Sequence, residues 1–486
     1  MQTLNSKLVP VTKRPIKVAQ FGEGNFLRGF ADYFIDWGNE AGLCDAGIAV
    51  IKPISFGNFD LFAKQDNIYT VLLRGSENGA PIEKKRVVTS IQATVDPFAD
   101  YSAYLALAKS PDLRFVISNT TEAGIVFNAG DKMADCPNVT FPGKLTVFLF
   151  ERFKEYKGDP AKGLIMIPCE LIDYNGRNLK ECVEKYTELW QLGAEFTAWV
   201  KDACIFASTL VDRIVTGYPR DEAAAICERL GYEDNLIVTG EPFAFWVIES
   251  DKDFSAELPI HKLPGAEVLF TDDVTPFKER KVRILNGAHT SMVPAAYLSG
   301  KDFVLDCVGD DVIKAFLNKT IFEEIIPTLS LDKEMLKGYA GAVTDRFANP
   351  HIKHALLAIA LNSTAKWRAR ILPSLKGYVK NFGKLPANIT FSFAALAAFY
   401  NGVKNEKGEL VCMRGNEEYK IFDDAHAIDF FAQNCKLPAA ELIAKLASDA
   451  EIWGEDLTKI EGFAAEATKY LELIRKDAKA AIAAMK

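Results

Sequence analysis

The sequence predicts an α/β protein of two domains, a Rossmann-like, doubly wound parallel sheet over residues 1–275 and a mainly α-helical domain over residues 276–486. Three observations predict this fold. Short apolar segments alternate with helical patterns in the first half, a glycine turn follows the first apolar segment, and long helical patterns dominate from Pro276 onward. With 486 residues, the chain is long enough for two or three domains of ordinary size.

The first predicted strand, residues 16–21, leads into a turn with the sequence GEGNFLR, and helical periodicity follows over residues 30–42. Gly22 allows a tight turn. Gly24 lets the backbone approach a pyrophosphate at a helix N-terminus, where amides and the helix dipole favour anions. The third glycine of the usual fingerprint is replaced by Leu27. We predict a dinucleotide-binding turn made of Phe21, Gly22, Gly24, Asn25, Phe26 and Arg28.

The second strand is predicted over residues 47–54. An NAD site usually has an acid at the end of this strand, where it holds the ribose hydroxyls. This sequence has Lys52 and Ser55 there, and the first acid is Asp60. The residues alone therefore leave the choice between NAD and NADP open.

The rest of the first domain alternates strands and helices, which predicts a parallel sheet. The predicted strands are residues 69–73, 85–94, 113–118, 163–168 and 203–208, and the predicted helices are residues 145–157 and 179–200.

A polar loop of small residues follows the strand at 113–118. Such a loop lies along a cofactor at the carboxyl end of a parallel sheet, although a plain connecting loop has the same composition. The residues of this loop that we assign to cofactor binding are Asn119, Thr120, Thr121 and Glu122.

The second half is predicted to be helical, with the domain boundary near residue 275 and no internal repeat or low-complexity segment. Its predicted helices are residues 278–298, 310–326, 332–347, 352–371, 388–401 and 426–434, with further helical pieces over 438–486.

The first of these helices carries three polar side chains that suit proton transfer: Lys281, Asn286 and His289. At about 100° per residue, Asn286 and His289 lie one turn apart on nearly the same face, and Lys281 lies about 80° from His289. A buried lysine is a usable general base, an amide donates to a developing alkoxide, and an imidazole orients a hydroxyl. The structural alternative is a surface lysine, a cap-forming Asn-Gly and a histidine satisfied within the core.

Composition excludes several classes of function. A net charge of −8 makes nucleic acid and anionic membrane poor partners, and no apolar run is long enough to span a bilayer. Nine scattered cysteines without a C-x-x-C pair, and an N-terminus without the apolar core of a signal peptide, predict a protein of the reducing cytoplasm. No zinc-type ligand spacing is present, and His351 and His354 lack an obvious third ligand, so we predict no metal site.

Taken together with the glycine turn, the K-x4-N-x2-H pattern of residues 281–289 resembles the active-site signature of the polyol-specific long-chain dehydrogenases. Four further segments match blocks of that family, and the resemblance covers essentially the whole chain. These segments are QFGEGNFLRGF, PCELIDYNG, TLVDRI and DRFANP. The phrase SNTTEAGI is most similar to the members of the family that reduce tagaturonate.

The resemblance implies a zinc-independent, NAD-dependent enzyme that interconverts tagaturonate and altronate in hexuronate catabolism, as a monomer or a small homo-oligomer. Fructuronate and mannitol are the alternative substrates of the family. It further implies that Lys281 is the catalytic acid/base, that Asn286 stabilises the oxyanion, and that His289 orients the substrate. Asp212 and Arg346 match substrate-contacting positions, for which a structural salt bridge is the alternative.

Two positions depart from the family pattern. The asparagine that completes the oxyanion hole is Leu171 here, and a family lysine aligns roughly with His354, which we include among the substrate-binding residues. Both changes are consistent with a keto-uronate substrate that meets a local cation.

Other functions fit less well. The Tyr-x-x-x-Lys spacing of short-chain dehydrogenases occurs at Tyr297 and Lys301 and at Tyr400 and Lys404, but both pairs lie in the helical half. A zinc alcohol dehydrogenase lacks its ligands. A dinucleotide-binding sensor without activity would explain the glycine turn, but not the lysine, asparagine and histidine on one helix.

Overall fold

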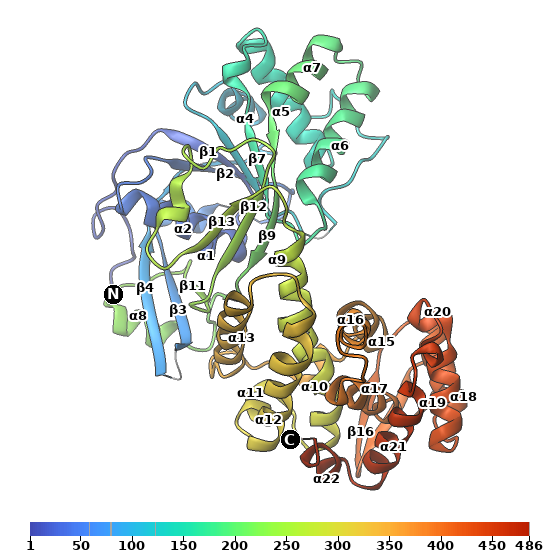
Figure 1. The fold of residues 1–486 in the computed structure, drawn as a ribbon. Coiled ribbons are helices and arrows are strands. Elements are labelled where there is room, and N and C mark those ends of the chain that lie inside the picture. Colours follow the sequence, from blue (N-terminus) through green and yellow to red (C-terminus); the bar gives the residue numbers. More distant parts are fainter. Residues whose placement is uncertain (58, 78–79, 122, 486) are drawn as a thin grey trace. The chain divides into compact units, whose positions relative to one another are not determined.

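The computed structural model describes residues 1–57, 59–77, 80–121 and 123–485 (Figure 1). The chain forms two compact units. Unit 1 comprises Met1–Arg74 and Pro81–Val274, and unit 2 comprises Gly75–Ala80 and Thr275–Lys486. No helix in the described ranges is long and apolar enough to cross a membrane.

The central sheet of unit 1 has six strands, and every neighbouring pair is parallel. Numbered along the sheet-forming strands, the order is 3-2-1-4-5-6, which is the Rossmann order. The prediction of a doubly wound parallel sheet is therefore confirmed. Across the sheet, the strands are β5 (Ile91–Val95), β2 (Gly47–Ile51), β1 (Ile16–Phe21), β6 (Phe115–Ser118), β7 (Ile165–Pro168) and β8 (Ile205–Phe206).

A hydrophobic core lies on each face of this sheet, because successive residues of a strand point to opposite faces. Val18 of β1 packs into one core together with Phe30 and Phe34, and Ala19 packs into the other core. The second core is covered by four helices, which lie together in Figure 1. They are α4 (Tyr101–Ala108), α5 (Phe141–Glu155), α6 (Asn175–Leu189) and α7 (Ala194–Ala203).

The single helix predicted over 179–200 is wrong, because α6 and α7 are separate helices. The chain between them turns at Gln191, with φ 51°, and at Gly193, with φ 91°. Both values lie in the left-handed region, which breaks a right-handed helix.

The single strand predicted over 85–94 is also wrong, because it is split between two sheets. β4 (Ala80–Val88) pairs into a second sheet, whereas β5 belongs to the central one. Between them, the amide of Thr89 donates to Asp36 Oδ1 at 2.7 Å, which turns the chain out of the second sheet.

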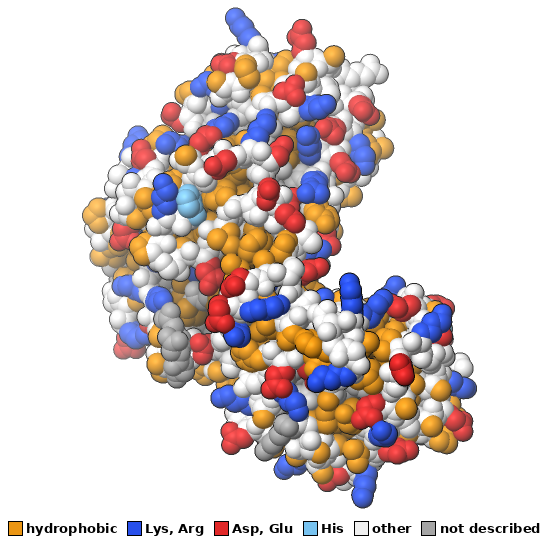
Figure 2. All heavy atoms as spheres, in the orientation of Figure 1, with side chains coloured by type: hydrophobic (Ala, Val, Ile, Leu, Met, Phe, Trp, Pro, Cys, Tyr) orange, Lys and Arg blue, Asp and Glu red, His pale blue; other side chains and the backbone are white. Residues whose placement is uncertain are grey.

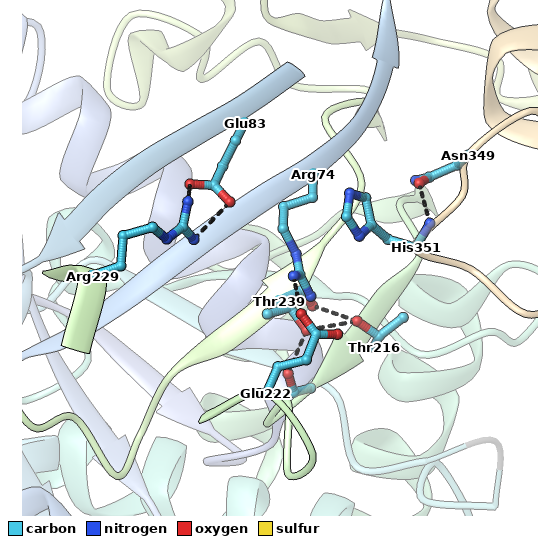
Figure 3. A network of polar contacts seen from close by, with 9 residues as sticks. Arg74, Glu83, Thr216, Glu222, Arg229, Thr239, Asn349 and His351 are labelled. Carbon is cyan, nitrogen blue, oxygen red and sulfur yellow. Dashed lines mark hydrogen bonds and ion pairs between the residues drawn. The ribbon is translucent and has the colours of Figure 1, made fainter. Parts of the chain in front are cut away.

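Ion pairs connect the second sheet to α8 (Ala223–Leu230) and its N-cap residue Glu222. Arg74 pairs with Glu222, and Arg229 makes a two-point contact with Glu83 of β4 (Figure 3). The strands of this sheet are β10 (Val215–Gly217), β11 (Val238–Gly240), β3 (Tyr69–Glu77) and β4, and a third sheet contains β13 (Glu267–Thr271), β12 (Phe245–Glu249) and β9 (Ser208–Asp212).

Unit 2 is built around two buried helices, α10 (Gly287–Leu298) and α17 (Ala387–Phe399), which pack on each other. Every residue of α17 from Asn388 to Phe399 is buried, as expected of a helix that is apolar on all sides. The surrounding helices are α11 (Val304–Val308), α12 (Asp311–Lys319), α13 (Lys333–Phe347), α15 (Ser363–Arg370), α16 (Leu372–Phe382), α18 (Ala425–Asn434), α19 (Ala439–Ser448) and α21 (Phe463–Lys476).

One prediction for this half is wrong, and one feature of it was not predicted. The helix expected over 352–371 is broken into α14 (Leu356–Ile359) and α15, because Asn362 between them has φ 53°. An antiparallel three-stranded sheet was not expected in this half. It consists of β14 (Gly402–Lys404), β15 (Leu410–Arg414) and β16 (Glu417–Ile421).

Candidate functional site

The glycine turn after β1 is held closely against the neighbouring strands. Gly22 has φ 122°, and its amide donates to the carbonyl of Ile51 at 3.1 Å. A Cβ atom at Gly22 would lie 3.1 Å from the carbonyl oxygen of Asn119. The side-chain amide of Gln20 donates to the carbonyl of Gly22 at 3.1 Å. A residue with a side chain would therefore be strained at Gly22 and would push against the carbonyl of Asn119, directly after β6.

Gly24 differs, because the space beside it is open. It is the N-cap of α1 (Asn25–Gly29), with φ −65°, and a Cβ atom there would have no heavy atom within 4 Å. The backbone can therefore be approached closely from outside, at a point where helix-start amides need acceptors. This arrangement fits the diphosphate of a dinucleotide.

Arg28 and its neighbours support the turn from inside the protein. The Arg28 guanidinium donates to the carbonyls of Glu23 and Leu236 and to Asn25 Oδ1 at 2.7–3.1 Å, and it is buried. Phe26 stacks on Phe30 with 5.0 Å between ring centroids. The contacts of Arg28 are those of a residue that positions the turn.

The polar loop after β6 is fixed by Glu170, a buried residue that the sequence analysis did not select. Thr120 donates to Glu170 Oε1 through its backbone amide and its hydroxyl, both at 2.9 Å. The side-chain amide of Asn119 donates to the carbonyl of Cys169 at 2.8 Å. Burial raises the pKa of Glu170, although hydrogen bonds from Thr120 oppose that shift. Thr121 has φ 80°. The predicted cofactor residue Glu122 lies outside the described residues.

Asp212 is the last residue of β9, where its Cα pairs with Phe245, and it is buried. The next residue, Arg213, donates from Nη1 to the carbonyl of Gly29 at 2.8 Å and so links β9 to α1. Burial lowers the pKa of Arg213 to about 10. The structure thus holds Asp212 beside a rigid connection to the glycine turn.

Leu171 stands where the family has an asparagine, and the residue is 63% exposed. The nearby Asn175 is not a substitute donor, because its side chain is already committed. Its Nδ2 donates to the carbonyls of Pro168 and Glu170 at 3.0–3.1 Å, and its Oδ1 accepts from the amide of Thr209 at 2.8 Å.

In unit 2, the segment that contains Lys281 and Asn286 is a π-helix. The rod is continuous through α9 (Thr275–Arg280), η3 (Lys281–Asn286) and α10. The angles predicted from a regular wheel therefore do not apply between Lys281 and Asn286, because i→i+5 bonding widens each turn. Turns of this kind are frequent at functional sites.

His289 lies in the first turn of α10 and is buried against aromatic rings. Its ring stacks on Phe347 with 4.2 Å between centroids, and the ring of His354 meets it edge-on at 5.1 Å. Within the described part of the chain, His289 Nε2 has no hydrogen-bond partner. A buried ring nitrogen in this condition is suited to a ligand hydroxyl.

Burial lowers the pKa of His289 well below 6.5, and the neighbouring charges of His354, Arg346, Arg370 and Lys366 act in the same direction. Burial also lowers the pKa of His354, and Lys366 adds to that shift. Burial and the surrounding cations therefore disfavour the protonated form of both imidazoles.

Arg346 and His354, which both influence His289, lie in different kinds of secondary structure. Arg346 is in the last turn of α13 and is buried, whereas His354 follows a non-helical segment in which Asn349 Oδ1 accepts from the amide of His351 at 3.0 Å (Figure 3). The helix that ends at Phe347 does not reach His354, so the angle expected for a continuous helix does not apply.

Two cations that the sequence analysis did not select lie on α15. Arg370 donates to the hydroxyl of Thr290, the residue after His289, at 3.3 Å. Lys366 lies one turn earlier, and its Nζ donates to the carbonyl of Ile359 at 2.7 Å. The four-residue spacing of Lys366 and Arg370 could have pointed to them in the sequence, since it places two cations on one helix face.

The alternative Tyr-x-x-x-Lys pairs have structural partners. Lys301 pairs with Asp310 at 2.9 Å, and Tyr297 lies between Arg414 and aromatic rings. Tyr400 donates to Asp423, and Lys404 pairs with Asp429. Among residues 1–57, 59–77, 80–121 and 123–485, no group of three or more histidine, cysteine, aspartate or glutamate side chains could hold a metal ion.

The two units correspond to two known domain families. Residues 16–262 match the mannitol dehydrogenase Rossmann domain, and residues 273–475 match the mannitol dehydrogenase C-terminal domain. The altronate oxidoreductase of Enterobacter sp. (strain 638) is 45% identical over 481 residues, which cover 98% of this chain and 97% of that protein. The altronate oxidoreductase of Yersinia enterocolitica (serotype O:8 / biotype 1B) is 45% identical over 492 residues and 100% of both chains.

Solved structures share the fold. The mannitol 2-dehydrogenase of Pseudomonas fluorescens, in a ternary complex with NAD and D-mannitol, is 22% identical, covers 99% of each chain and gives a TM-score of 0.65. A substrate-free D-sorbitol dehydrogenase is 21% identical, covers 99% of this chain and 100% of its own, and gives a TM-score of 0.76. At these identities the likeness concerns the fold alone.

Proposed function

The chain is a dehydrogenase of the mannitol dehydrogenase family, and we propose that its reaction is tagaturonate + NADH + H⁺ ⇌ altronate + NAD⁺. The observation that carries this proposal is the 45% identity to altronate oxidoreductases over 98% of the chain. Membership of a dehydrogenase family sets aside the non-enzymatic sensor. The nine unpaired cysteines suit the cytoplasm as its location.

The charge around His289 supports a substrate that carries a carboxylate. Arg346, Arg370 and Lys366 all act electrostatically on His289, although the chain as a whole has a net charge of −8. On the face drawn in Figure 2, acidic and basic side chains are interspersed over each unit. A local group of two arginines and one lysine is therefore a specific feature that a uronate would match and a neutral ketose would not.

NAD, when bound, supplies the hydride acceptor of the reaction, and NADH the donor. We assign its diphosphate to Gly22 and Gly24, because the first fixes a tight turn and the second leaves its backbone open. Asn119 and Thr120 line the same end of the sheet, and their ties to Cys169 and Glu170 keep that loop in place.

Proton transfer is assigned to unit 2. In reduction, the Lys281 ammonium gives a proton to the carbonyl oxygen of the substrate, and in oxidation the neutral amine accepts it from the hydroxyl. The Asn286 amide donates a hydrogen bond to the oxygen as negative charge develops there. The His289 ring orients a substrate hydroxyl through Nε2, the buried nitrogen that lacks a protein partner in the described structure.

A substrate panel tests the proposal directly. The purified chain is mixed with NADH and with tagaturonate, fructuronate or fructose, and the loss of NADH fluorescence gives kcat/KM for each. We expect tagaturonate to be preferred, with fructose lowest because it has no carboxylate. A preference for fructuronate would reassign the chain to the other keto-uronate reaction, and a preference for fructose would reject the role of the cations.

A further inference from the structure

Lys52 immediately follows β2, at the position that in dinucleotide-binding folds lies beside the adenosine ribose. The residue there distinguishes NAD, which has a free 2′-hydroxyl, from NADP, which carries a 2′-phosphate. An acid is usual for NAD, and a nearby cation accommodates the 2′-phosphate. A lysine at this place is therefore unexpected in an NAD enzyme, because a free cation there would favour the 2′-phosphate of NADP.

The residue that explains this lysine follows the neighbouring strand. Asp96 directly follows β5, and the two strands pair in parallel with Ile51 opposite Val95, so Lys52 and Asp96 emerge side by side. Lys52 Nζ lies 2.8 Å from Asp96 Oδ2. The backbone amide of Lys52 also donates to the carbonyl of Val95 at 3.0 Å. The lysine is thus held at both ends.

Asp96 is itself fixed in place. Its Oδ1 accepts from the amide of Phe98 at 2.9 Å, and its carbonyl accepts from the amides of Ala99 and Asp100 at 2.9–3.1 Å. The Lys52 side chain is 7% exposed and the Asp96 side chain is 25% exposed. An ion pair so little exposed and so well anchored keeps its geometry better than a surface pair does.

A second carboxyl group lies in the same region, together with the Arg28 guanidinium. Burial raises the pKa of Glu23, which lies in the glycine turn; Lys52 and Arg28 lower that pKa, and Asp96 raises it. A Cβ atom at Gly57 would lie 3.4 Å from Glu23 Oε1, which places the segment after β2 against this carboxylate. Two cations and two carboxyl groups thus lie in this region, and the Arg28 guanidinium is already committed to acceptors on Glu23, Leu236 and Asn25.

We propose that Asp96 is the residue that makes the chain select NAD over NADP, because it holds the Lys52 ammonium and presents its own carboxylate to the ribose. A 2′-phosphate carries a charge of about −1.5 to −2 at pH 7, by analogy with other phosphate monoesters. It would meet two carboxyl groups and two cations, Lys52 and Arg28, that are already committed to protein acceptors. A 2′-hydroxyl can instead donate to the oxygens of Asp96. This inference rests on the proposed dinucleotide-dependent function.

The test measures the direct binding of NADH and of NADPH to the full chain. Binding is monitored through nicotinamide fluorescence in the absence of substrate, which gives a Kd for each cofactor. In Asp96→Asn the amide oxygen still accepts from Phe98, but the negative charge is lost and Lys52 is released. A new charged hydrogen bond to the 2′-phosphate is worth about ten- to a hundredfold in affinity. We expect the ratio of the Kd for NADPH to that for NADH to fall at least about tenfold in Asp96→Asn.

The gain must depend on Lys52. In Asp96→Asn combined with Lys52→Met, the ratio should return to or above its value in the unmodified chain. Asp45→Asn is the matched control, because Asp45 pairs with Arg14 at 2.8 Å in the same unit, and it should leave the ratio unchanged. An unchanged ratio in Asp96→Asn, or a gain that survives the loss of Lys52, would overturn the inference.

Lys52→Met alone covers the case in which Asp96→Asn does not fold. It leaves the Asp96 carboxylate without its cation, so NADPH binding should weaken more than NADH binding. Equal weakening of both would make Lys52 a purely structural residue and reject the inference. Failure of the proposed function looks different: the unmodified chain would then bind neither cofactor or fail to reduce a keto-uronate, whatever the ratio in the variants.

Discussion

The imidazole of His289 stacks on the phenyl ring of Phe347, with 4.2 Å between centroids and 24° between the ring planes. A protonated ring in this place would be cut off from water and surrounded by cations. Burial lowers the pKa of His289 well below 6.5, with His354 and Arg346 adding to the shift. Both effects favour the neutral form of the His289 ring.

We predict that His289 does not titrate between pH 6 and 9, whereas His426 does. The hydrogen bond to Asp449, at 2.9 Å, raises the pKa of His426 above 6.5, so this residue serves as the internal control. The chain has five histidines, and NMR of the labelled imidazoles can follow each one. If His289 gained its proton in the same range as His426, the assignment of a neutral ring would be wrong.

The same pKa shift has a consequence for stability. In the unfolded chain an exposed imidazole takes up a proton near pH 6.5, whereas in the folded chain His289 does not. The unfolded state then binds more protons, so the contribution of His289 to the free energy of unfolding is lost as the pH falls below 6.5.

We predict that Lys281→Met loses turnover but keeps its affinity for NADH. A positioned proton-transfer group contributes about 10²- to 10⁴-fold, so kcat should fall by about that much. The lysine belongs to unit 2, and the glycine turn belongs to unit 1. Turnover is measured at saturating NADH, and the Kd for NADH is measured separately by fluorescence.

Lys337→Met is the matched control for this prediction. Lys337 is an exposed lysine of the same unit that pairs with Glu334, and its removal should leave kcat within about twofold, as for most surface changes. A parallel fall in kcat and in NADH affinity for Lys281→Met would argue against a role in proton transfer.

Arg346→Ala and Arg370→Ala should each weaken kcat/KM for tagaturonate by about ten- to a hundredfold, the worth of a charged hydrogen bond. The loss should be much smaller for any neutral ketose with residual activity, since it has no carboxylate to lose. Arg368→Ala is the control, because Arg368 is an exposed arginine of the same helix as Arg370. Equal losses on charged and neutral substrates would assign these arginines to the fold.

Gly22→Ala and Gly24→Ala should have different effects. At Gly22 the positive φ and the contact with Asn119 strain any side chain, so Gly22→Ala should lower both Tm and NADH affinity. At Gly24 the φ is ordinary and the space is open, so Gly24→Ala should keep its Tm within about 2 °C while NADH affinity falls. The affinity falls because a methyl group would occupy the approach to the backbone. Thermal unfolding and NADH titration of both variants check this, and an equal loss of Tm would reject the distinction.

The sequence by itself determined the fold class and the alternation of strands and helices along the first domain. Strand and helix periodicities are local, and a glycine turn between a strand and a helix needs only the conformational freedom of Gly22. The glycine turn at residues 22–28 and the lysine, asparagine and histidine of residues 281–289 could therefore be selected as candidate site residues from the sequence, and their roles stay predictions.

Tertiary structure decided what depends on distant partners. Lys52 and Asp96 are 44 residues apart, and only the pairing of β2 with β5 brings them together. The same holds for Arg370, which reaches Thr290 across 80 residues. The π-helical turn at Lys281–Asn286 is also of this kind, because i→i+4 and i→i+5 bonding use the same backbone groups and the surrounding packing selects between them.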